Sequence, residues 1–536
     1  MTIPTKPSAG GLYEFCHFHT EEGDTEAMMK CAIDLMEGQQ NRIEFSATSY
    51  LLILSGALVF FMQAGFAMLC AGSVRKKNTH NTMLKNLLDA CGAAIAYFCV
   101  GFAFAFGGDS TATGTTFIGT TNFFGKGDIS YPFFFFQYTF AAAAVTIVAG
   151  ALAERCQMAA YLCYSFFLTG FVYPVVAHAV WSVAGFLSFS NPEPLLGIGM
   201  IDFAGSAVIH LTGGTTALIS TYLLGSRRGR FYDLETGKEL DKPKPMPGHS
   251  VSLQVLGTFI LWFGWFGFNG GSALLIPATE YQSEIAAVCA INTFLASSSG
   301  CIASMLVRLI KFKRSGGHAV FDLTSAMNGT LCGLVAITAG CGTLEPWGAI
   351  IVGLVAGIMY PLASDLLIWL KIDDVVDAIP VHFVGGLWGA LAVGLLSEPE
   401  LTRKVTGTSH HPGFFYSLSE GHSDARLLGC QTIGVLCIIG WNTVTMLPFF
   451  LGLHRLNWFR TEAVEEIVGL DLCFNDLSHH KGEDIEQENQ MRDEYLVAYE
   501  EYKLKQVQRK KHGGSTSDAR SIRSGGSGIS SQFVDT

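Results

Sequence analysis

Long, uninterrupted apolar segments constrain this chain of 536 residues more than any other feature. A helix needs about 20 apolar residues to cross the hydrocarbon core of a bilayer. Eleven segments have such a length, near residues 46–72, 87–107, 132–153, 159–187, 203–225, 250–274, 283–307, 318–340, 346–370, 378–396 and 427–453. They lack the alternation of a membrane β-strand. We therefore expect an all-α polytopic membrane protein with eleven transmembrane helices.

The charged residues support this class and predict an orientation. They make up 15% of the chain, against about 25% in soluble proteins. No predicted folded region carries a basic stripe, which argues against a nucleic-acid partner. With the N-terminus outside, the cytoplasmic loops hold most of the basic loop residues, namely Arg75, Lys76, Lys77, Arg155, Arg227, Arg228, Arg230, Arg308, Lys311, Lys313, Arg314 and Lys371. The positive-inside rule then predicts N-out, C-in topology.

The predicted spans divide the chain into three parts. Residues 1–45 are expected to form an extracellular segment, 46–453 the membrane domain, and 454–536 a cytoplasmic tail that is disordered from about residue 513. The N-terminus lacks a signal-peptide pattern, so the first span is expected to direct insertion. Cys16 and Cys31 lie in the polar N-terminal segment, where both a disulfide and two free thiols remain open.

Two of the predicted spans share a His-x-x-Gly-Gly pattern. One copy is His210-Leu211-Thr212-Gly213-Gly214 and the other is His382-Phe383-Val384-Gly385-Gly386. Five spans separate the copies, so the two halves would have opposite topology. That arrangement is typical of an inverted repeat with its site at the midplane. We expect a five-plus-five inverted repeat with one extra helix.

Histidines are costly in hydrocarbon and usually face a cavity or a partner. Two neutral imidazoles can share one proton, so His210 and His382 together could bind a small polar molecule or relay a proton. Two unrelated histidines, each bonded to a nearby carbonyl, are the alternative. No further ligand cluster supports a metal site, and no cofactor is expected. Asp202 and Asp377 precede the two histidines and are expected first to cap their helices. Asp202 would also add a negative potential that favours a cation.

Ordered motifs elsewhere identify a family resemblance. They include Phe136-Gln137-x-x-Phe140, Gly150-Ala151-Leu152-Ala153-Glu154-Arg155, Asp202-Phe203-Ala204-Gly205-Ser206, Gly264-Trp265-Phe266-Gly267-Phe268-Asn269, Asn328-Gly329, and Asp373-Asp374-Val375-Val376-Asp377. Over residues 48–472 the chain resembles the ammonium transporter (Amt/Mep/Rh) family, and within it the plant-type Amt branch. The resemblance implies a homotrimer with one pore in each subunit.

The same resemblance implies roles for individual residues. Phe140, Trp181 and Ser272 would form an outer NH4+ site, in which aromatic faces attract a cation. Phe140 and Phe268 would form a gate below it, and His210 and His382 would line a dry lumen. Gln137, Asp202 and Asp377 would support the site. Ammonium would be deprotonated and conducted as NH3, with net NH4+ uptake if the proton follows.

Other functions remain open at this point. An electroneutral NH3 channel would leave the proton behind, and an ammonium sensor would signal through the tail. A channel for water or CO2 would gain little from the aromatic site, and no nucleophile–base pair supports an enzyme. The family's phosphorylatable threonine is replaced by Cys473, although Ser521 and Ser524 remain candidate kinase targets. Plasma membrane is the expected location.

Overall fold

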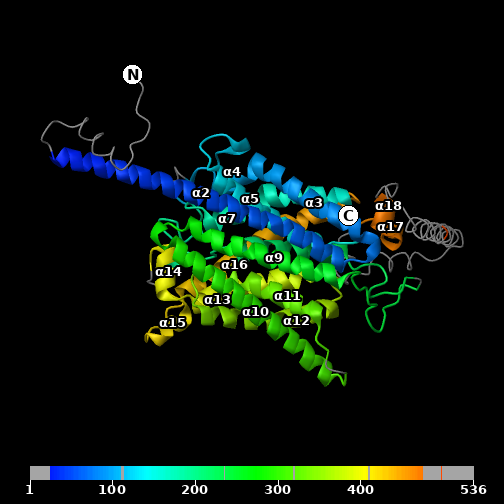
Figure 1. The fold of residues 1–536 in the computed structure, drawn as a ribbon. Helices are drawn as coiled ribbons and strands as arrows, with labels where there is room; N and C mark the ends of the chain where they lie inside the picture. Colours follow the sequence, from blue (N-terminus) through cyan, green and yellow to red (C-terminus); the bar gives the residue numbers. More distant parts are fainter. Residues whose placement is uncertain are drawn as a thin grey trace.

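The computed structural model describes residues 25–109, 114–234, 236–317, 320–408, 411–474 and 497. These residues form an α-helical bundle whose long helices run alongside one another (Figure 1). Helix α2 projects from one end of the bundle, and the short tail helices α17 and α18 lie at the other end. Ten helical runs of the described chain are long and apolar enough to cross a membrane. The predicted all-helical polytopic class is therefore confirmed.

The ten runs follow the predicted spans closely. Four of them contain short π-helical turns: η2 and η5 join two α-helices without a break, whereas η7 and η10 precede α8 and α13. The ten runs are α2 (Thr25–Ser73), α3–η2–α4 (Thr79–Ala96, Tyr97–Gly101, Phe102–Phe106), α5 (Tyr131–Ala151), α6–η5–α7 (Met158–Phe167, Leu168–Val172, Tyr173–Trp181), η7–α8 (Ser206–Leu211, Thr212–Leu224), α9 (Val251–Ser272), α10 (Gln282–Arg314), α12 (Pro346–Trp369), η10–α13 (Ile379–Val384, Gly385–Leu396) and α16 (Arg426–Arg455).

The predicted span at 318–340 is shorter than expected. Its helix, α11, covers Leu323–Ile337, only 15 residues, or about 22 Å at ~1.5 Å per residue. Nearly all of its residues are buried, because it packs against both α10 and α12. Small residues allow this contact, since a Cβ on Gly329 would stand 2.4 Å from the Cβ of Ser304. A helix enclosed in this way need not match the bilayer thickness over its own length.

The first span begins earlier than expected. Helix α2 starts at Thr25, so the backbone does not change its conformation at the predicted boundary at residue 45. Residues 26–45 contain no proline and a single glycine, and once a helix exists each further residue adds a hydrogen bond. Cys31 in this extension is disulfide-bonded, whereas Cys16 lies outside the described residues.

Helix α5 forms the centre of the bundle. From Phe136 to Ala151 every residue is buried, and α5 packs against α2, α3 and α8. Alanines and glycines make up much of this stretch, which lets neighbouring backbones approach closely. The segments η7 and η10, which carry the two histidines, also pack against each other. The candidate site therefore lies inside the protein.

The tail folds back onto the loops at its end of the bundle. Helices α17 (Ala463–Val468) and α18 (Leu470–Phe474) follow α16. Glu466 accepts a hydrogen bond from the backbone N–H of Arg228 at 2.6 Å. Asp471 accepts bonds from the N–H groups of His80 and Asn81 at 3.0 and 2.7 Å, so it caps the start of α3. The predicted disorder from about residue 513, with Ser521 and Ser524, lies outside the described residues.

Candidate functional site

The two predicted histidines meet inside the bundle. Nδ1 of His210 lies 3.2 Å from Nδ1 of His382, and the rings stack with centroids 5.2 Å apart. The exposed fractions are 0% for His210 and 6% for His382. Each histidine lies in a π-helical turn, a local widening that occurs often at functional sites. The prediction that the rings form a pair is confirmed.

The pair leaves a ring nitrogen available. In the contact between the two Nδ1 atoms, one ring donates and the other accepts. Nε2 of His210 is buried and has no hydrogen-bond partner among the described residues. The ring stacks on Trp265 at 5.2 Å and on Phe268 at 5.7 Å. A buried polar atom is costly without a partner, so Nε2 is suited to bind a small polar molecule.

The shared glycines let the two histidine segments cross closely. A Cβ on Gly214 would stand 2.3 Å from the backbone nitrogen of Phe383. A Cβ on Gly386 would stand 2.5 Å from the carbonyl oxygen of Ser206. The second glycine of each His-x-x-Gly-Gly motif therefore contacts the backbone of the other segment. This reciprocal contact brings the two imidazoles together.

A series of aromatic rings leads to the histidine pair. The rings of Phe140 and Phe268 have centroids 4.4 Å apart, and both residues are buried. Trp181 lies 5.9 Å from Phe140 on the other side. Phe268 in turn contacts His210. The order Trp181, Phe140, Phe268 and His210 agrees with the proposed outer site, gate and lumen.

Ser272 and Asp202 lie beside the outer end of this series. Ser272 is one helical turn beyond Phe268 on α9, and its hydroxyl donates to the carbonyl oxygen of Phe268 at 2.9 Å. Its own oxygen can still accept a hydrogen bond. Trp181 donates from Nε1 to the carbonyl oxygen of Asp202 at 2.7 Å. This bond connects the indole to the loop before η7.

The carboxylate of Asp202 caps the first histidine segment, as expected. It accepts bonds from the N–H groups of Gly205, Ala207 and Val208 at 3.1, 2.8 and 2.8 Å. Burial raises the pKa of Asp202 to about 6, although these backbone bonds oppose the rise.

Asp377 does not cap the second histidine segment, so this expectation was wrong. Asp374 caps this segment instead, because its carboxylate accepts hydrogen bonds from the N–H groups of Val376 and Ile379 at 3.3 and 2.7 Å. Asp377 has a left-handed backbone with φ of 58°. Its carboxylate accepts from Tyr360 Oη at 2.8 Å and from Ser364 Oγ at 3.1 Å. The side chain thus bonds to α12 rather than to its own helix.

Gln137 is buried on α5, one turn before Phe140. Its Oε1 has no hydrogen-bond partner in the described part of the chain. No contact joins it to the histidines or to the aromatic series in that part of the chain. The predicted supporting role of Gln137 stays a prediction.

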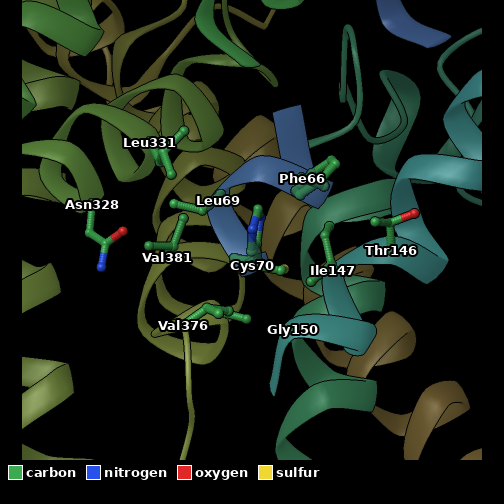
Figure 2. A pocket seen from close by; sticks show the side chains of 12 residues that line it. Phe66, Leu69, Cys70, Thr146, Ile147, Gly150, Asn328, Leu331, Val376 and Val381 are labelled. Carbon is green, nitrogen blue, oxygen red and sulfur yellow. The ribbon is translucent and has the colours of Figure 1, made fainter. Parts of the chain in front are cut away.

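A cavity lined by His382 (Figure 2) is also lined by Cys70 and Gly150, near the ends of α2 and α5. The tail binds just beyond this end of α2, where Leu470 donates to Asn78, so the cavity lies on the tail side of the histidine pair. It is small, with a volume of about 20 Å³. Its walls are mostly apolar and come from four segments of the chain. They comprise Phe66, Leu69, Cys70, Thr146, Ile147, Gly150, Asn328, Leu331, Val376, Ala378, Val381 and His382. The series from Trp181 to His382 therefore continues into an apolar space.

A buried ion network fixes the loops around the inner end of this cavity. Arg227 donates to both carboxylate oxygens of Asp373, at 2.8 and 2.9 Å, and lies 3.3 Å from Glu154. Burial alone would raise the pKa of Asp373, but the adjacent guanidinium of Arg227 holds this pKa well below its usual range. Arg75 forms a second ion pair with Glu154. These bonds connect the ends of α2, α5, α8 and α12.

Three residues of the site had no predicted role. Trp265 stacks on His210 and donates to Thr338 Oγ1 at 2.9 Å, Phe66 lies 6.4 Å from the ring of His382, and Asn328 lines the cavity. Trp265 and Asn328 belong to motifs that carried the family resemblance. The residues that the structure describes contain no group of three His, Cys, Asp or Glu side chains that could hold a metal.

Comparisons with known sequences point to one family. The profile of the Ammonium Transporter Family matches residues 50–478. The chain is 44% identical over 416 residues to putative ammonium transporter 1 member 5 of Arabidopsis thaliana, covering 76% of this chain and 80% of that protein. It is 38% identical over 455 residues to putative ammonium transporter 1 of Caenorhabditis elegans, covering 82% of this chain and 80% of that protein.

Solved structures give the same result for the fold. The crystal structure of Candida albicans Mep2 matches with a TM-score of 0.67 at 29% identity, over 82% of this chain and 93% of that chain. A structure described as a sensor Amt protein matches with a TM-score of 0.66 at 31% identity, over 81% and 100%. The chain is thus similar to members that carry a transporter name and to one that carries a sensor name.

Proposed function

Because the chain belongs to the ammonium transporter family, we propose that it recruits NH4+ at an aromatic outer site, deprotonates it, and conducts NH3 past a phenylalanine gate and a twin-histidine lumen. The single observation that carries this proposal is the buried contact between His210 Nδ1 and His382 Nδ1 at 3.2 Å. It places two titratable rings at the inner end of a closed aromatic series. The protein is a membrane transporter and not an enzyme.

Recruitment depends on the outer aromatic residues. Trp181 and Phe140 offer ring faces within 5.9 Å of each other, and such faces attract a cation by about 0.5–2 kcal/mol each. The oxygen of Ser272 can accept an N–H bond. Asp202 adds negative charge when it is ionised. This combination favours NH4+ over a neutral solute such as water or CO2.

Selectivity follows from the cost of the dry interior. A bare ion is very unfavourable in an apolar lumen, and K+ cannot lose its charge whereas NH4+ can lose a proton. Phe140 and Phe268 close the passage to hydrated ions. NH3 can then accept a hydrogen bond from one imidazole, or donate one to it. If the histidine pair also passes the proton, the net species is NH4+; otherwise it is NH3.

The wider arrangement is also proposed. The reciprocal contacts of Gly214 and Gly386 support a five-plus-five inverted repeat. The basic residues at the tail end of the bundle, such as Arg227 and Arg230, support an N-out, C-in orientation. We also propose a homotrimer in the plasma membrane, with a tail that receives kinases or other regulators.

Ammonium sensing is a second candidate function. It is favoured by the match to a structure described as a sensor Amt protein. The tail contacts are compatible with it, because Glu466 and Asp471 connect the tail to loops of the membrane domain. A sensor would bind ammonium at the same site and pass the change to these contacts.

Currents from the purified protein separate these candidates. Proteoliposomes on a solid-supported membrane receive a pulse of ammonium or of K+, and the internal pH is followed in parallel. A saturable current with ammonium and none with K+ supports net NH4+ transport. Alkalinisation above the protein-free rate without current supports an NH3 channel. Silence in both assays, with ammonium still bound, contradicts transport and favours the sensor.

A further inference from the structure

The cavity on the tail side of His382 contains an amide that the mechanism above does not use. Asn328 lies on α11 and lines this cavity together with His382. It is only 5% exposed. Figure 2 shows its side chain at the edge of the cavity, across from Thr146 and Ile147. Apolar side chains form most of the remaining wall, so a polar atom here needs an explanation.

A hydrogen-bonded chain fixes the orientation of this amide. Tyr360 Oη lies 2.8 Å from Oδ2 of Asp377, and Nδ2 of Asn328 lies 3.0 Å from the same Oη. The phenolic hydrogen of Tyr360 is directed to this carboxylate oxygen. The phenolic oxygen must then accept from Asn328, and the contacting atom of the amide must be its N–H group.

The other amide atom faces the cavity. With Nδ2 held by Tyr360, Oδ1 of Asn328 is turned toward Val381 and the cavity (Figure 2). Oδ1 accepts no hydrogen bond from the part of the chain that the structure describes. In a flipped amide, Oδ1 would face the oxygen of Tyr360. Because the phenolic hydrogen already bonds to Asp377, two acceptors would then lie in contact without a hydrogen between them. The chain of bonds therefore presents the acceptor Oδ1 to the cavity.

We propose that Oδ1 of Asn328 forms an inner subsite for ammonium and ammonia, with Tyr360 and Asp377 as its positioning residues. This inference rests on the proposed transport function and extends it to the tail side of the histidine pair. Ammonia and ammonium both carry N–H donors, and Oδ1 is an acceptor. A molecule leaving His382 meets this acceptor before it reaches bulk water, and a molecule entering from the tail side meets it first.

A purely structural role makes a different prediction. If Asn328 served only to pair with Tyr360, its substitution would affect folding and transport equally from both faces of the membrane. An inner subsite instead affects binding from the tail side more than binding from the opposite side. The apparent affinity for ammonium supplied to each face therefore distinguishes the two roles.

The test uses the full chain with an affinity tag at its C-terminus. Proteoliposomes captured through the tag have the tail outside, and those that are not captured have it inside. Ammonium-dependent currents or pH changes are recorded on both fractions for the wild type, Asn328→Leu and Tyr360→Phe. Thr330→Val is the matched control, because Thr330 lies on the same helix and bonds only to the carbonyl of Ala326.

We expect the KM for ammonium from the tail side to rise about tenfold in Asn328→Leu, the loss that one hydrogen bond to a ligand produces. Tyr360→Phe keeps the amide but removes the phenolic oxygen that accepts its N–H, so the KM from the tail side should rise as well. The KM from the opposite side should stay within about twofold of wild type. Thr330→Val should match wild type from both sides.

Three results would overturn the inference. A transporting wild type with unchanged KM in both variants would show that Oδ1 binds nothing. An equal rise from both faces, or a rise in Thr330→Val, would indicate a structural role of α11. If Asn328→Leu does not fold, the KM values of Tyr360→Phe from the two faces decide between the two roles. A wild type that moves neither charge nor ammonia would instead overturn the proposed function itself.

Discussion

Gly214 lies so close to Phe383 that a Cβ at position 214 would stand 2.3 Å from the backbone nitrogen of Phe383. Neither backbone can move without displacing a histidine, because His210 and His382 lie on the same two segments. Gly386 makes the matching contact with Ser206 and Leu211. The distance between the imidazoles is thus set by glycines and not by the histidines themselves.

Gly214→Ala should therefore lower both stability and transport. Real Cβ atoms do not approach a backbone atom so closely, and overpacking of this kind costs about 1–3 kcal/mol. We expect a lower thermal unfolding midpoint in detergent and a reduced ammonium current. Gly440→Ala on α16 is the control, because a Cβ there would meet nothing within 4 Å. A Gly214→Ala protein as stable and active as Gly440→Ala would refute the role of this contact.

Trp181→Leu should weaken ammonium recruitment more than it slows the later steps. The substitution removes a cation-binding ring face worth about 0.5–2 kcal/mol, so the KM from the outer side should rise roughly 2- to 30-fold. The maximal current should change less. Trp369→Leu is the control, since Trp369 is exposed on α12, away from the aromatic series. An unchanged KM in Trp181→Leu would exclude the indole from the outer site.

The contribution of Asp374 to the stability of the protein should fall as the pH rises from 5 to 7. Burial, and then the charge of Asp377, raises the pKa of Asp374 to about 7 from 3.8. A carboxyl whose pKa is raised by folding binds its proton more tightly in the folded state. Its contribution is complete below the unfolded pKa and is lost as the pH rises through the folded pKa. Asp202, with a pKa raised to about 6, acts in the same window.

Asp374→Asn should reduce this pH dependence. Asparagine can still cap η10 but carries no charge at any pH. In thermal unfolding at pH 5, 6, 7 and 8, the unfolding midpoint of the wild type should fall relative to that of the variant up to about pH 7. Asp373 has a lowered pKa, and its contribution is lost only at more acidic pH. Equal slopes for variant and wild type would contradict the assignment to Asp374.

Asp471→Ala should release the end of the tail from the membrane domain. It removes the acceptor for the N–H groups of His80 and Asn81 at the start of α3, and loss of a helix cap costs about 0.5–2 kcal/mol. Limited trypsin digestion should therefore cut the tail near Arg460 roughly 2- to 30-fold faster. Asp241→Ala, in an exposed loop, should leave the rate unchanged. No acceleration in Asp471→Ala would mean that other contacts hold the tail.

Much of the fold could be predicted from the sequence, because a bilayer imposes one strong rule. Apolar length located ten helices well, and a repeated motif identified His210 and His382. The remaining span, α11, was predicted too long, because burial by α10 and α12 removes the need for bilayer length. The extension of α2 was missed because its polar residues were taken as the end of the helix, although nothing in residues 26–45 breaks one.

The details of the site depended on backbone geometry that a pattern does not contain. Asp374 and Asp377 both precede the second histidine segment, and only the left-handed backbone of Asp377 decides which of them caps it. The stacking of Trp265 on His210 and the orientation of Asn328 arise from contacts between distant helices. The homotrimer, the orientation in the membrane and the plasma-membrane location stay predictions.

The most direct test of the twin-histidine lumen is the ammonium current of His210→Ala, His382→Ala and the double variant. Both rings act on one molecule through one contact, so the ammonium current of each single variant should fall at least about tenfold. The double variant should lose little more than either single variant, because residues that act as a unit are not additive. Wild-type current in either single variant, with the protein folded, would contradict passage of ammonium between His210 and His382.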